Sequence, residues 1–71
     1  MTEKDAEKVL RHVIEIETGL KTIIDVATKL DSDEERIALR KGVATVISEM
    51  YEQIERPIYR EHPGITGRRD L

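Results

Sequence analysis

The chain has 71 residues, enough for one small domain, and it contains no Cys, which excludes disulfides and thiolate metal sites. Charged residues make up 38% of the sequence and aromatic residues only 3%, and the formal net charge is −3. No apolar run is long enough to span a membrane, and an acidic chain is a poor general binder of nucleic acid. We therefore expect neither a membrane nor a nucleic acid as the main partner.

The first residues of the chain, 1–5, are polar and mixed in charge. A signal peptide would begin with basic residues followed by an apolar stretch. Together with the absence of Cys, this predicts a cytoplasmic protein.

A helix is predicted over residues 3–30, because apolar residues recur there at alternating steps of three and four. This a/d series comprises Ala6, Val9, Val13, Ile16, Leu20, Ile23, Ala27 and Leu30. Leu10 and Ile24 widen the apolar stripe, which is typical of a helix that touches two neighbours. Thr2, followed three residues later by Asp5, is a suitable N-cap.

The acidic segment 30–35 predicts a tight bend. Asp31 or Ser32 can cap a second helix, and Ser32 with Glu35 fits the capping-box pattern. So short a link makes the two helices antiparallel neighbours. The bend Leu30-Asp31-Ser32-Asp33-Glu34 between two heptad-bearing helices resembles that of the plasmid copy-control proteins, which are homodimers of helical hairpins that bind paired RNA loops. The first helix here departs from that pattern, since it is acidic and offers no aromatic residue for stacking on bases.

A second helix is predicted over residues 33–56, followed by a short turn at 57–61, where Pro57 kinks or ends the helix. Its apolar residues again recur by heptads, with Leu39 and Val46 on a second flank. They are Ile37, Ala44, Tyr51 and Ile58, with Ile47 and Ile54 between them and Val43 and Met50 alongside. The hairpin thus covers residues 1–61.

Residues 62–71 contain Gly and Pro and are predicted to form a flexible tail. Its basic and apolar residues could form a segment that docks on another protein, and the alternative is a solvated tail. The docking candidates are Arg60, Ile65, Arg68 and Arg69.

Folding the chain at the bend brings Gly19 to the level of Gly42. Glycine destabilises a helix interior, so two glycines at one level suggest that the helices approach closely there. The alternative is that one or both are exposed.

The fold class is all-α: an antiparallel two-helix hairpin that dimerises into a four-helix bundle. Two helices cannot enclose a core, so each stripe stays open on one side, and a second copy is the simplest cover. The alternative is a different protein as the partner, which would cover the stripes equally well. The residues predicted to form this core and dimer seam are Val9, Leu10, Val13, Ile16, Leu20, Ile23, Ile24, Ile37, Val43, Ile47, Met50, Tyr51 and Ile54.

Candidate chemistry is sparse. His12 and Glu15 lie one turn apart and could share a metal, but no second His-bearing helix completes such a site. We expect no enzyme, no cofactor and no metal. Arg36, Arg40 and Lys41 could contact RNA, and the alternative is pairing with nearby acids such as Asp25.

These patterns predict a non-enzymatic interaction protein: a homodimer acting as an adaptor or regulator of an unidentified protein. The alternative is an RNA-binding regulator that uses the basic start of the second helix.

Overall fold

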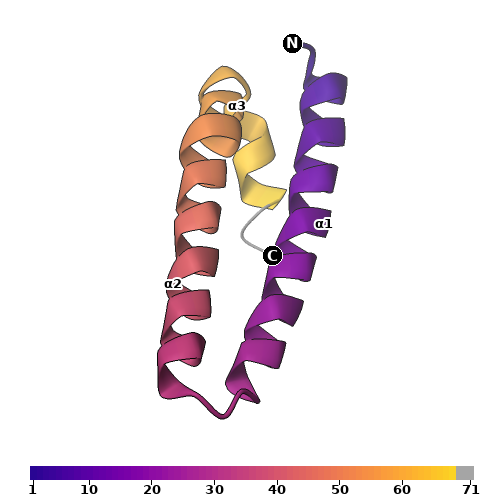
Figure 1. Cartoon of the computed structure of the whole chain (residues 1–71). Coiled ribbons are helices and arrows are strands. Elements are labelled where there is room, and N and C mark those ends of the chain that lie inside the picture. Colours follow the sequence, from indigo (N-terminus) through magenta and orange to yellow (C-terminus); the bar gives the residue numbers. More distant parts are fainter. Residues whose placement is uncertain (69–71) are drawn as a thin grey trace.

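The computed structural model describes residues 1–68, with the side chains of residues 1–65. Its two long helices, α1 (Glu3–Thr28) and α2 (Asp33–Met50), lie side by side and antiparallel (Figure 1). The described residues are all helical or in short links and contain no strand. The predicted all-α helical hairpin is therefore confirmed. The molecule is slim, measuring 46 × 17 × 16 Å.

Side-chain caps fix the start of both helices. The hydroxyl of Thr2 accepts a hydrogen bond from the Asp5 amide at 3.1 Å, and the hydroxyl of Ser32 accepts one from the Glu35 amide at 3.2 Å. Each cap satisfies an amide that has no partner inside its helix. Both caps were predicted from the sequence. The first helix ends at Thr28 and not at Leu30, so the bend begins slightly earlier than expected.

The sequence predicted that Pro57 kinks or ends the second helix, with a short turn over residues 57–61. In the structure the chain is helical through these residues. Residues Tyr51–Glu55 form a π-helical turn, and α3 (Arg56–Glu61) continues from it. Within this turn the Arg56 amide bonds to the Tyr51 carbonyl, five residues back. Pro57 has no amide hydrogen to donate and sits in the first turn of α3, where none is needed. The wider turn thus carries the helical path past the proline.

A short 3₁₀ segment, Pro63–Arg68, packs back between the ends of α1 and α2 (Figure 1, yellow). Ile65 in this segment is only 1% exposed and joins Ala6, Leu10 and Ile58 in one buried cluster. The structure therefore differs from the expected flexible tail for residues 62–68. An isolated apolar residue in a Gly- and Pro-containing segment gives no periodic signal, so its burial could not be foreseen. Residues 69–71 lie outside the described part.

Among residues 1–68, no helix combines the length and the apolar character needed to cross a bilayer.

Candidate functional site

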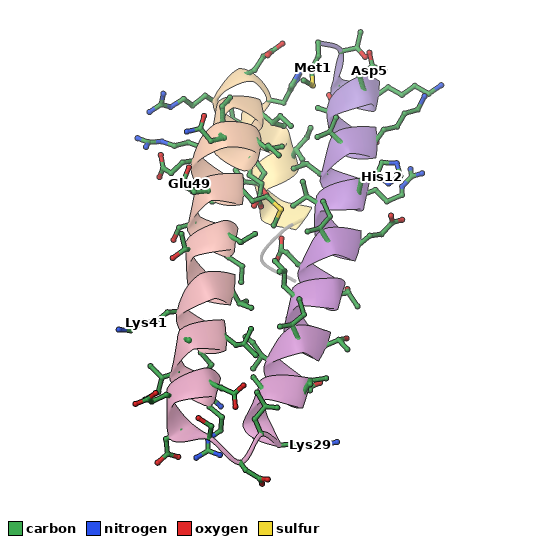
Figure 2. The ribbon with its side chains drawn as sticks, in the orientation of Figure 1. Met1, Asp5, His12, Lys29, Lys41 and Glu49 are labelled. Carbon is green, nitrogen blue, oxygen red and sulfur yellow. The ribbon has the colours of Figure 1, made fainter. Side chains whose placement is uncertain are left out.

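The contact between α1 and α2 uses one row of residues on each helix. On α1 the row runs through Leu10, Val13 and Ala27, with Leu20 and Ile24 partly buried. On α2 the buried members are Val43 and Met50. Apolar side chains fill the space between the two helices in Figure 2, whereas His12, Lys29 and Lys41 point away from it. One row per helix is all that a two-helix contact can cover.

Many large apolar side chains lie outside these rows and remain exposed. In the described part of the chain they outnumber the buried ones. They are Met1, Ile14, Ile16, Ile23, Val26, Ile37, Leu39, Val46, Ile47, Tyr51 and Ile54. Single exposed apolar residues are ordinary on protein surfaces, whereas contiguous ones mark interaction sites. Their grouping therefore decides what they mean.

Most of these exposed residues lie on one of two sides of the hairpin. The side follows from how many positions a residue lies from the buried row of its helix. Ile16 and Ile23 lie four residues before the inward Leu20 and Ala27, and Leu39 and Val46 lie four residues before Val43 and Met50. An offset of four residues turns a helix side chain by about 40° from the inward direction. Because the helices are antiparallel, equal offsets on both fall on the same side of the hairpin. The four side chains therefore share one side.

Two glycines extend this side. Gly19 directly precedes Leu20 and Gly42 directly precedes Val43, and a Cβ added at either would meet nothing within 4 Å. Both glycines are thus exposed, because an offset of one residue turns them about 100° from the inward direction. The predicted close approach of α1 and α2 at these glycines is therefore not seen. Val26 has the same offset from Ala27. We call this surface the glycine face; it comprises Ile16, Gly19, Ile23, Val26, Leu39, Gly42 and Val46.

The opposite side is less uniform. On α2 it carries residues one or four positions after an inward-facing residue. On α1 it carries Ile14, with Glu7 and Lys21 one heptad before and after it. We call it the tyrosine side, because Tyr51 meets Tyr59 of α3 there, with ring centroids 6.4 Å apart. Its apolar α2 residues are Ile37, Ala44, Ile47 and Tyr51. Charged residues of α1 interrupt the apolar surface on this side.

The predicted seam contains inward and outward residues together. Leu10, Val13, Val43 and Met50 are buried. Val9, Leu20 and Ile24 are partly buried. Ile16, Ile23, Ile37, Ile47, Tyr51 and Ile54 are exposed. The inward row on α1 therefore includes Leu10 and Ile24, which the sequence had suggested as flanks, and it excludes Ile16 and Ile23.

The predicted basic group at the start of α2 is engaged at the bend. The Arg36 guanidinium pairs with Asp33 and donates to the Leu30 carbonyl. Arg40 reaches the Thr28 hydroxyl at 3.4 Å. Lys41 is exposed and points away from the hairpin (Figure 2). Two of the three cations thus hold the bend together.

The proposed docking residues of the tail are separated. Ile65 is buried in the cluster, whereas Arg60 is exposed on α3. Arg68 belongs to the 3₁₀ segment by its backbone, and its side chain lies outside the description, as does all of Arg69. Ile65, which was predicted to dock on a partner, is therefore already buried within the chain.

His12 Nδ1 lies 3.0 Å from a Glu15 carboxylate oxygen on the exposed face of α1. Within residues 1–68, no three His, Asp or Glu side chains gather as a metal site would require. Sequence reasoning missed Glu55, which is 2% exposed and accepts a hydrogen bond from the Tyr59 hydroxyl at 3.3 Å. The π-helical turn rotates Glu55 inward, and heptad counting assumes a regular helix.

The start of the chain is clasped to the end of α3. The Met1 ammonium lies 3.0 Å from Glu61 Oε1, and His62 Nε2 lies 3.0 Å from the Met1 carbonyl. The hydrogen bond from the ammonium, and then its charge, lower the pKa of Glu61 below the ordinary value of 4.5. This exposed ion pair tethers α3 to the start of α1.

The chain matches no protein-family model, no curated protein and no solved structure, which leaves its own residues as the evidence for its function.

Proposed function

We propose that the protein is a non-enzymatic interaction protein that works as a homodimer. Two hairpins would form a four-helix bundle, and the bundle would act in the cytoplasm as an adaptor or regulator of another protein. The observation that supports this is the excess of exposed over buried large apolar side chains in a hairpin only 17 Å wide. Covering apolar surface contributes about 25 cal/mol per Å², so a second copy would add stability that a single hairpin lacks.

The tyrosine side would remain available to the other protein after dimerisation. It combines exposed Ile37 and Ile47 with Tyr51, and aromatic residues are enriched at protein interfaces. Two such sides, one on each hairpin, would give the dimer a pair of equivalent contact sites. This arrangement suits a protein that joins or regulates other chains.

The competing function, binding of structured RNA, has weaker support. Arg36 and Arg40 are tied to Asp33, Leu30 and Thr28. Only Lys41 of that group points freely outward. A gel-shift titration with structured RNA at low salt should show no complex. A salt-sensitive complex that is lost in the Arg36→Ala, Arg40→Ala double variant would favour the RNA function instead.

Concentration dependence of unfolding tests the homodimer. A dimer that unfolds to two chains has a midpoint that rises with protein concentration, by mass action. We expect the urea midpoint of the full chain to rise between low and high micromolar concentration. A midpoint that stays constant over this range would contradict the homodimer.

A further inference from the structure

We infer that the glycine face is the surface on which the second copy docks, with the helices of the two copies closest at Gly19 and Gly42. This inference rests on the proposed homodimer and specifies its interface. The face is built from both helices. Its large side chains are each between 40% and 56% exposed: Ile16, Ile23 and Val26 on α1, and Leu39 and Val46 on α2.

The glycines lie at the centre of this face. Gly19 is nine residues from the bend end of α1 at Thr28, and Gly42 is nine residues from the bend end of α2 at Asp33. They are therefore level with each other. The large apolar side chains lie above and below them, so the face is lowest where the glycines are. A second chain can approach the backbone most closely at such a place.

Each glycine lowers the stability of its helix in the single hairpin. Glycine in a helix interior is less favourable than alanine by up to about 1 kcal/mol. Within residues 1–68 nothing requires a glycine at either position, since an added Cβ would meet no described atom within 4 Å. Neither residue has the positive φ that would explain it. Contact with a second chain supplies the missing reason.

A whole side of the hairpin is large enough for a stable dimer. The hairpin is 46 Å long and 17 Å wide, so the side that would be covered by a stacked second copy measures about 800 Å² in outline, with the glycine face as its apolar centre. Specific interfaces bury about that area on each partner. The opposite side is a poorer candidate, because Lys21 of α1 lies in the middle of it, whereas Glu35 and Glu49 lie at the two ends of the glycine face.

Two hairpins can stack through this face about a twofold axis in two ways, either with α2 on α2 or with α1 on α2. The charges favour one of them. Stacking α2 on α2 around the glycines would bring Glu35 of one copy against Glu49 of the other, because each lies seven residues from Gly42. Stacking α1 on α2 instead places His12 of one copy beside Glu49 of the other, at the same level of the hairpin (Figure 2). Like charges that face each other are unfavourable, so we assign the second arrangement.

A matched pair of isoleucines tests the location. Ile16, on the glycine face, is 49% exposed, and Ile14, on the tyrosine side of the same helix, is 47% exposed. The dimer dissociation constant is measured by sedimentation for the full-length wild type, Ile16→Glu and Ile14→Glu, with helicity checked by circular dichroism. We expect Ile16→Glu to weaken the dimer about a hundredfold or more, because it buries an unpaired charge, and Ile14→Glu to change it little.

The glycines provide a test that misfolding cannot mimic. Gly19→Ala and Gly42→Ala should strengthen the isolated helices, since the added Cβ has space in the hairpin. In a dimer that closes on the glycines, the same Cβ would separate the chains and weaken association about tenfold. A weaker dimer made of more helical chains is therefore the expected result.

Failure of the homodimer and failure of the glycine-face interface give different results. A wild type that stays monomeric at all concentrations would overturn the homodimer and the interface together. A dimeric wild type that is weakened equally by Ile14→Glu and Ile16→Glu, or by Ile14→Glu alone, would overturn the interface and leave the homodimer in place. Tighter association of the two alanine variants would also overturn it.

Discussion

The two ends of the hairpin differ in how completely they cover their apolar residues. At the end that holds both termini, α3 and the 3₁₀ segment add a third element, and Ala6, Leu10, Ile58 and Ile65 form a buried cluster (Figure 1). Toward the bend the described residues form only two helices, and Ala27 and Val43 are the buried residues among them. We refer to these as the clustered end and the bend half.

The bend half is no less apolar than the clustered end. It carries Ile23, Val26, Ile37 and Leu39, all of which are exposed. A two-helix contact buries one row per helix, whatever the number of apolar residues available, and only an additional layer can cover the rest. At the clustered end the chain supplies that layer itself. In the bend half we propose that a second copy of the chain supplies it.

The largest effect is expected at the clustered end. Ile65→Ala should lower the free energy of unfolding by about 3 kcal/mol, because it empties a site that is almost completely buried. Ile37→Ala in the bend half is the control, since Ile37 is 55% exposed and should change stability by less than about 0.5 kcal/mol. Urea unfolding of both variants at one protein concentration measures the difference. Equal losses would remove the distinction between the two ends.

An intermediate effect is expected at the bend. Ser32→Ala removes the side chain that caps α2 and should lower the free energy of unfolding by about 1 kcal/mol. Ser48→Ala, on the exposed surface of the same helix, should be neutral or slightly stabilising. If Ser32→Ala leaves the unfolding curve unchanged, the bend half does not depend on this cap.

The smallest effect is expected from the clasp at the clustered end. The pKa of Glu61 is lower in the folded chain than in the unfolded chain, so its ionised form stabilises the fold. This contribution is present above pH 4.5 and is lost as the pH falls through the lowered pKa. Wild type should therefore melt slightly higher than Glu61→Gln near neutral pH, and the difference should vanish in acid. A difference that persists in acid would show that the carboxylate charge is not its source.

Local features of the fold could be predicted from the sequence. Ser32 as a cap, the tight bend and two heptad-bearing helices follow from short-range chemistry, and each is present. The inward row of α1 could not be predicted, because Val9 and Leu10 are both apolar, as are Ile23 and Ile24. Which member of such a pair faces inward depends on the rotation of the helix, which the other helix and the third layer determine.

Features that depend on irregular backbone also escaped prediction. The π-helical turn before Pro57 rotates everything after it, so heptad counting could not place Glu55 in the interior. Ile65 has no apolar neighbour in sequence that would reveal its burial. The apolar stripes and the two glycines at one level, which make up the candidate interface, could be identified from the sequence. Their assignment to an exposed face required the three-dimensional arrangement.

One hairpin leaves more apolar surface than it can cover, and we propose that it acquires the missing layer from a second copy. Sedimentation equilibrium of the full chain at tens of micromolar decides whether it does. We expect a mass of twice the 8.2 kDa of the single chain, with a return toward 8.2 kDa on dilution. A folded species of 8.2 kDa at every concentration would contradict it.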